Sequence, residues 1–272
     1  MTHAALRRGG GWLATCSKFA AVAGMSMQRR SRQLAELAVR SSFLAVMLFI
    51  FSQLWRVVPG PPGYSLTQLI WYMAFAEGII FTTSSNTEPE LDRELRNGDI
   101  TYRIARPLAF PLHHLAASLG DRLVRWVFNL TVALLLAYAL VGMLPMHGLA
   151  VTAAVSCALL AVVIDELVTL TLSMTSLWIE SSYGLHLLYR RGMLLLGGAL
   201  VPLSVYPEWL ARICAALPFR HLIAGPATLF VGRDAHDWAN LTALQLGFGA
   251  TVVLVAYTLY RLGLRRMVAQ GG

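Results

Sequence analysis

The sequence predicts an all-α integral membrane protein with six transmembrane helices. Of its 272 residues, 57% are hydrophobic and only 13% are charged, and the mean hydropathy is +0.60. Soluble domains average about 25% charged residues, so this composition excludes an ordinary soluble domain. The hydrocarbon layer of a membrane is about 30 Å thick, and six apolar stretches are long enough to cross it as helices. We expect one membrane domain and no room for a separate soluble domain.

The elements are expected in the following order. Residues 1–27 form a flexible cytoplasmic tail, residues 28–266 form the membrane domain, and residues 267–272 form a cytoplasmic tail. The spans are predicted at about residues 39–58, 66–83, 123–144, 149–178, 187–206 and 241–260. The fourth stretch is overlong, so that helix is tilted, kinked or extended past the bilayer.

Residues 27–40 precede the first span and alternate basic side chains with leucines. Leu34 and Leu37 fall on one helical face, whereas Arg29 and Arg30 fall elsewhere. This pattern is typical of an amphipathic helix lying on the inner leaflet. The alternative is a solvated basic flank of the first span.

Residues 207–237 connect the fifth and sixth predicted spans. They are apolar, but Pro207, Pro218, Gly225 and Pro226 interrupt them. No piece is long enough to cross the membrane as a helix. We expect a broken external re-entrant hairpin that dips into the outer leaflet and is sheltered by protein.

The distribution of basic residues predicts the orientation. Most of the 22 Lys and Arg residues fall in the segments expected inside, and only Arg56, Arg212, Arg220 and Arg233 fall outside. This bias predicts a multi-pass protein of the bacterial cytoplasmic (inner) membrane with both termini cytoplasmic. The same bias explains the net charge of +8. Nucleic-acid binding is not expected, because no basic run carries interleaved aromatic residues.

The most charged segment, residues 88–125, lies between the second and third spans. Leu91, Leu95 and Ile100 recur near helical spacing, Gly98 interrupts them, and Pro107 ends the pattern. A short amphipathic helix with apolar anchors and a charged rim can dock in a groove of a partner protein. We expect this segment to receive a mechanical input from a cytoplasmic partner. The alternative is a solvated inner loop.

Asp165 and Glu166 lie near the middle of the fourth predicted span, and Glu77 lies in the second. Ionised carboxylates in lipid are costly, so these side chains should face the bundle interior, a water-filled cavity or a cationic partner. A role in the substrate path or gate is one interpretation. The other is a structural pairing with an arginine or polar group on a neighbouring helix or subunit.

Motifs for enzymatic chemistry are absent from the sequence. It has no GxxxxGK[ST], HExxH or GxSxG pattern. Cys16, Cys157 and Cys214 are far apart, and the adjacent His113 and His114 would point about 100° apart on a helix. We therefore expect no catalytic residue, metal site or cofactor in this chain.

Two stretches resemble a known family. RNGDITYRIARPL follows the second predicted span, and GGALVPLSVYPEWLARICAALPFRHLIAGPATLFVG runs from the fifth span into the hairpin. Both are similar to motifs in permease subunits of ATP-binding cassette (ABC) type-2 exporters, in the branch of short six-span permeases formerly of unknown function. The resemblance covers residues 28–266.

The resemblance implies a permease that works with a separate ABC ATPase. Two permeases, identical or paralogous, would join two ATPase copies, and MgATP would bind to the ATPase. Residues 88–106 would hold the coupling helix, the basic helix from Gln28 would be the connecting helix, and the re-entrant hairpin would begin at Pro207. The residues expected to couple to the ATPase are Leu91, Arg93, Leu95, Arg96, Gly98, Asp99, Arg106 and Pro107. The candidates for the translocation path or gate are Glu77, Asp165, Glu166, Pro202, Pro207, Pro218 and Phe219.

The expected function is therefore efflux. The permease would move a drug, toxic cation, natural product or lipid-like compound out of the cell, with membrane lipid as a further partner. An ATP-independent, ion-coupled carrier is the alternative. A more distant one is an intramembrane enzyme that uses Asp165 and Glu166.

Overall fold

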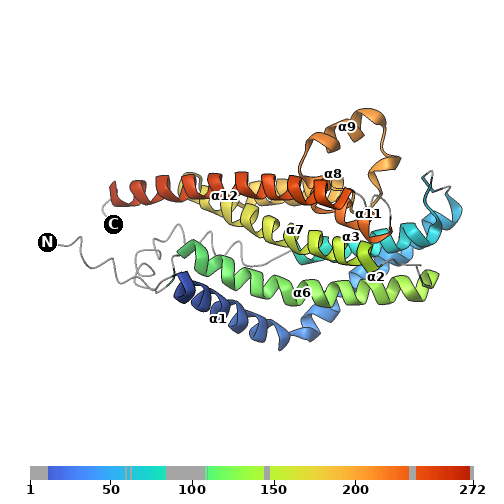
Figure 1. The fold of residues 1–272 in the computed structure, drawn as a ribbon, viewed down its shortest axis with the longest axis horizontal. Coiled ribbons are helices and arrows are strands. Elements are labelled where there is room, and N and C mark those ends of the chain that lie inside the picture. The colour runs from blue at the N-terminus through green and yellow to red at the C-terminus, as the bar shows by residue number, and fades with distance from the viewer. Residues whose placement is uncertain are drawn as a thin grey trace.

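The computed structural model describes residues 12–58, 60–61, 63–83, 108, 110–143, 148–232 and 237–269. Every regular element in these ranges is helical, which confirms the predicted all-α class for this part of the chain (Figure 1). The α-helices are α1 (Trp12–Ser31), α2 (Leu34–Val57), α3 (Leu66–Thr83), α6 (Phe110–Val141), α7 (Gly148–Met174), α8 (Tyr183–Leu196), α9 (Glu208–Ala216), α10 (Phe219–Leu222), α11 (Ala224–Phe230) and α12 (Trp238–Ala269). Two short 3-10 helices are η1 (Thr175–Leu177) and η2 (Leu203–Val205).

Successive long helices run in alternating directions along one bundle. In Figure 1, α2, α6 and α8 run towards the end that carries α9 to α11, and α3, α7 and α12 run away from it. We call that end the hairpin end. At the opposite end α6 begins and α12 finishes, whereas the shorter α3 finishes beside the middle of α6.

Helix α3 forms the centre of the bundle. Its residues from Leu69 to Ile79 are all buried, and it contacts α2, α6, α7 and α11. Gly78 permits a close approach to α6, because a Cβ atom there would lie 3.1 Å from Cδ1 of Leu130. The rings of Phe75 and Phe230 stack with centroids 4.3 Å apart and join α3 to α11.

Four helices in the described ranges are long and apolar enough to cross a membrane. They are α2, α6, α7 and α12. The pair Glu208–Ala216 and Phe219–Phe230 is bent by 75° and would make a fifth if it counts as one broken span. Helix α3 has 18 residues with Glu77 among them, and α8 has 14 residues. The chain is therefore a multi-pass membrane protein, and length and apolarity alone account for four of the six predicted spans.

The amino-terminal helix differs from the prediction. Helix α1 begins at Trp12, within the predicted flexible tail, and ends at Ser31, within the predicted interfacial helix. It lies along the first part of α6 (Figure 1). The approach is very close, because a Cβ atom on Gly120 of α6 would lie 2.2 Å from the carbonyl oxygen of Ala23. This packing explains why the helix extends through residues that looked like a tail.

Helices α2, α3, α7 and α12 overlap the first, second, fourth and sixth predicted spans, and α3 has the predicted bounds. Helix α6 begins at Phe110 and not at about residue 123, because neighbouring helices cover the charged side chains of its first turns. Helix α12 continues to Ala269, into the predicted carboxy-terminal tail.

The fifth predicted span, residues 187–206, is not one helix. Helix α8 ends at Leu196, and Gly198 has a φ of +76°, a conformation that glycine adopts readily. The hydroxyl of Tyr72 in α3 donates to the carbonyl oxygen of Gly198 at 2.7 Å. The amide of Ala224 donates to the carbonyl oxygen of Gly197 at 3.1 Å. Hydrogen bonds from α3 and α11 thus stabilise the break after α8. Beyond it the chain continues into the segment that carries α9 to α11, which we call the hairpin.

Candidate functional site: a buried charge network and a bent helix pair

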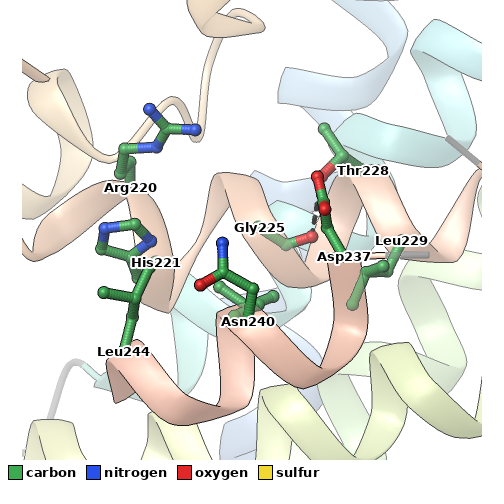
Figure 2. A pocket seen from close by; sticks show the side chains of 9 residues that line it. Arg220, His221, Gly225, Thr228, Leu229, Asp237, Asn240 and Leu244 are labelled. Carbon is green, nitrogen blue, oxygen red and sulfur yellow. Dashed lines mark hydrogen bonds between the residues drawn. The ribbon is translucent and has the colours of Figure 1, made fainter. Parts of the chain in front are cut away.

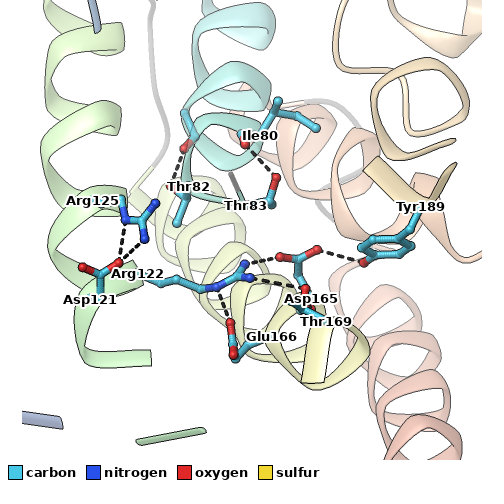
Figure 3. A network of polar contacts seen from close by, with 11 residues as sticks. Ile80, Thr82, Thr83, Asp121, Arg122, Arg125, Asp165, Glu166, Thr169 and Tyr189 are labelled. Atoms are coloured by element: carbon cyan, nitrogen blue, oxygen red, sulfur yellow. Dashed lines mark hydrogen bonds and ion pairs between the residues drawn. The ribbon is translucent and has the colours of Figure 1, made fainter. Parts of the chain in front are cut away.

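The two acids of α7 share one arginine. The guanidinium of Arg122 in α6 makes ion pairs with both Asp165 and Glu166 (Figure 3). The side chains of Arg122, Asp165 and Glu166 are 0%, 2% and 6% exposed. A buried charge of either sign is costly unless it is paired. The arrangement therefore holds α6 against α7.

Polar groups from α7 and α8 make further hydrogen bonds around Asp165. The hydroxyl of Tyr189 in α8 donates to Asp165 Oδ1 at 2.8 Å. Arg122 also donates to the hydroxyl of Thr169 at 3.3 Å, and that hydroxyl donates to the backbone carbonyl of Asp165 at 2.9 Å. One buried carboxylate thus joins three helices.

Asp121, the residue before Arg122, connects α6 to α1. Asp121 accepts a hydrogen bond from Nε of Arg125 at 2.7 Å and makes an ion pair with Arg30 of α1. Arg30 also lies 3.5 Å from Glu36 at the start of α2. We call Arg30, Asp121, Arg122, Arg125, Asp165, Glu166, Thr169 and Tyr189 the charge network.

The ion pairs of the charge network lie nearer the start of α6 than its end. Arg122 is 12 residues from the start of α6 and 19 from its end, or about 18 Å and 28 Å at 1.5 Å per residue. Asp165 is correspondingly nine residues from the end of α7. The acids therefore lie somewhat past the middle of α7, towards its end. We call the end where α6 begins the network end.

Sequence reasoning assigned Asp121, Arg122 and Arg125 to the polar segment. It missed the contact of Arg122 with α7 and that of Asp121 with α1. The signal was available in part, since two buried acids require a cation and Arg122 stands just before the third predicted span. Pairing with an arginine on a neighbouring helix, one of the two interpretations left open, describes the geometry found. Tyr189 gave no signal in the sequence.

Glu77 differs from the other two acids. It is buried in α3 and 2% exposed. Within the described residues, its Oε1 atom has no hydrogen-bond partner. Among the described residues, the structure thus distinguishes Asp165 and Glu166, which pair with Arg122, from Glu77, whose Oε1 has no partner.

The remaining gate candidates lie at helix starts in the hairpin. Pro202, Pro207 and Pro218 immediately precede η2, α9 and α10. Proline is tolerated there because the first amides of a helix lack an intrahelical partner.

Phe219 connects the hairpin to the charge network. Its ring contacts the ring of Tyr189, with centroids 5.9 Å apart. Gly192 on α8 leaves room for it, because a Cβ atom there would lie 3.2 Å from the Phe219 ring. Arg122, Asp165, Tyr189 and Phe219 thus form a continuous series of contacts from α6 to α10.

The predicted coupling residues Leu91, Arg93, Leu95, Arg96, Gly98, Asp99, Arg106 and Pro107 lie outside the described residues. Of the two helices that flank them, α6 begins at the network end, whereas α3, whose Gly78 packs against Leu130, ends beside the middle of α6 (Figure 1).

A polar pocket opens at the hairpin end between α10, α11 and the start of α12 (Figure 2). Its volume is about 280 Å³. It is lined by Arg220, His221, Gly225, Thr228, Leu229, Asp237, Asn240, Leu241 and Leu244. No cluster of three or more metal-ligating side chains occurs here or elsewhere in the part of the chain that the structure describes.

Comparison with known protein families identifies the family of the chain. A family model described as "ABC-2 family transporter protein" matches residues 42–271, from α2 through α12. The match includes Arg122, Asp165, the hairpin and the pocket. No curated protein compared with the chain matches it. Permeases of this family pair in general with an ABC ATPase subunit. The chain belongs to the ABC-2 transporter family and is a permease subunit of an ABC transporter.

Proposed function

We propose that this permease exports a drug, toxic cation, natural product or lipid-like compound from the bacterial cytoplasm. A separate ATPase, present in two copies, supplies the energy, and a second permease, identical or paralogous, completes the pathway. The observation that carries the proposal is the family match over residues 42–271.

In the proposed topology all six predicted spans cross the membrane. Helix α3 crosses although it carries Glu77, because it is enclosed by other helices and does not have to face lipid. Helix α8 crosses together with the broken segment that follows it. The alternation of helix directions in Figure 1 supports this count. The network end then faces the cytoplasm, as the arginines favour.

In this orientation the segment between α3 and α6 docks on the ATPase. Its proposed contact residues are the eight coupling residues named above, with Arg96 and Asp99 as the central charges. Support comes from α6, which begins at the network end, and from α3, which runs towards that end. A displacement of that segment acts directly on α3 and α6, and the charge network connects α6 to α7 and α8.

Transport requires two states of the permease pair, one open inward and one open outward. ATP shifts their populations only if the nucleotide-bound ATPase binds the two states unequally. The series from Arg122 through Asp165 and Tyr189 to Phe219 offers a route from the cytoplasmic segment to the hairpin. Glu77, Pro202, Pro207 and Pro218 are the proposed path or gate residues beside it.

Co-purification with the ATPase tests the proposal. The permease is expressed with candidate ABC ATPases from the same genome, beginning with any neighbouring gene, and isolated in mild detergent with and without ATP. We expect an ATPase to co-purify, and we expect Arg96→Glu and Asp99→Arg to weaken the complex. Arg212→Glu is the matched control, because Arg212 is exposed in α9 at the hairpin end. Failure of every ATPase to co-purify, or equal loss in the control, would contradict the proposal.

The burial of Glu77 favours a second candidate function, in which the protein is an ion-coupled carrier that does not use ATP. A buried carboxyl group whose Oε1 has no partner in the described residues could bind a proton or cation. Transport that stops with a protonophore at constant ATP, and that survives deletion of the ATPase, would establish the carrier. Transport that stops only on deletion of the ATPase would establish the exporter.

A further inference from the structure

The pocket at the hairpin end carries charges of both signs. Figure 2 shows Arg220 of α10 on one side and Asp237, just before α12, on the other, with Asn240 between them. Within the described residues, neither Arg220 nor Asp237 makes an ion pair, and both side chains are exposed. Both groups line the pocket, where a ligand with the complementary charges would contact them.

The inner wall of the pocket is fixed by a buried amide. Gln245 of α12 is fully buried, and its Nε2 donates to the carbonyl oxygens of His221 at 2.8 Å and Cys157 at 3.2 Å. These two bonds hold α10 against α7 and α12. The positions of Arg220 and His221 relative to Asn240 are thus set by the fold.

The floor and one rim of the pocket are apolar. Leu229 and Leu241 are buried, whereas Leu244 is 45% exposed. Below Leu244 the outward face of α12 continues with Leu254 and Val255, which are 65% and 45% exposed. An apolar chain can leave the pocket over Leu244 and follow this face.

The position and the size of the pocket indicate the kind of ligand. Trp238, beside the pocket, is 43% exposed, and exposed tryptophans concentrate at the level of the lipid head groups. The volume of about 280 Å³ lies just below the range of roughly 300–1,000 Å³ for drug-sized pockets. It suits a head group and not a whole amphipathic molecule.

We propose that this pocket binds the head group of a zwitterionic phospholipid that carries a primary ammonium group. Arg220, with His221 and Asn240, faces the phosphate, and Asp237 faces the ammonium group. One acyl chain passes over Leu244 onto α12. In the proposed orientation this lipid belongs to the outer leaflet, but the binding itself does not depend on the direction of transport or on the ATPase.

Lipid titration of the purified, delipidated permease tests the proposal, with native mass spectrometry as the readout. The probes are phosphatidylethanolamine, phosphatidylglycerol and water-soluble phosphoethanolamine. We expect tighter binding of phosphatidylethanolamine than of phosphatidylglycerol. Arg220→Gln should weaken the binding of both lipids by about tenfold, because it removes a charge-assisted contact to the phosphate. Asp237→Asn should weaken only phosphatidylethanolamine and so abolish the preference.

Arg212→Gln is the control, because Arg212 is an exposed arginine of the same hairpin that does not line the pocket. All three substitutions are at exposed positions, so each variant should remain folded, and gel filtration checks this. Equal losses in Arg220→Gln and Arg212→Gln, or a preference that survives Asp237→Asn, would overturn the proposal. Binding of phosphoethanolamine as tight as that of the lipid would also overturn it, since the ligand would then be a soluble phosphate compound. Co-purification of the ATPase is a separate readout, so failure of either proposal leaves the other standing.

Discussion

The two ends of the bundle use charged side chains in opposite ways. At the network end, Arg122, Asp165 and Glu166 are buried and paired across two helices. At the hairpin end, the ion pair between Arg212 and Glu208 lies within one helix, with side chains 80% and 88% exposed. Buried pairs constrain the helices that carry them, whereas exposed charges contribute little to stability and remain accessible to ligands. The difference agrees with the mechanical role proposed for the network end and the binding role proposed for the hairpin end.

The largest expected effect is the loss of Arg122. Arg122→Met leaves two buried carboxylates without their cation, and breaking a buried ion pair typically costs about 3–5 kcal/mol. Equilibrium unfolding of the purified permease in mixed micelles measures this change. Arg212→Met is the control at the hairpin end, and an equal loss in both variants would remove the distinction between the two ends.

A smaller effect is expected where α1 meets α6. Gly120→Val places a side chain 2.2 Å from the carbonyl oxygen of Ala23, so α1 must shift, at a cost of about 1–3 kcal/mol. Faster proteolytic cleavage within α1 would report the shift. Gly24→Ala is the control, because no atom lies within 4 Å of its added Cβ. Unchanged proteolysis of Gly120→Val would show that α1 is not held there.

The substitution Tyr189→Phe tests how α8 is attached to the charge network. The variant loses the hydrogen bond to Asp165 and keeps the ring that contacts Phe219. A hydrogen bond to a charged group is worth about 1.5–3 kcal/mol, and the lower value is expected because Arg122 continues to hold Asp165. A thermal unfolding midpoint equal to wild type would mean that α8 is not tied to the network through this hydroxyl.

The smallest effect is expected at the exposed pair of α9. Glu208→Gln removes the partner of Arg212, and exposed ion pairs contribute at most about 1 kcal/mol. The same unfolding experiment checks it. A loss as large as that of Tyr189→Phe would show that charges at the hairpin end also support the fold.

The sequence predicts the helices better than their pairing. Helix α3 was placed at its observed bounds because a Pro and Gly turn precedes it and a charged segment follows it. The early start of α6 escaped notice, because the polarity of Asp121, Arg122 and Arg125 is offset by partners from other helices. No periodicity along one chain segment reports such partners.

The end of α8 was missed for a related reason. The residues around Gly197 and Gly198 are apolar enough to continue a span, but the fold selects a break there. The bond from Tyr72 that holds the break joins residues 126 positions apart. The bend between α9 and α10 was predictable, since Pro218 interrupts the apolar run there. The pocket was not, because its walls come from three helices.

The most direct test of the account removes all the charges of the Arg122 cluster together. The triple variant Arg122→Met, Asp165→Asn, Glu166→Gln is compared with Arg122→Met by equilibrium unfolding. If the buried acids need Arg122 only as a partner, neutralising them should restore most of the stability lost in the single variant. A triple variant no more stable than Arg122→Met would contradict the account of the network end.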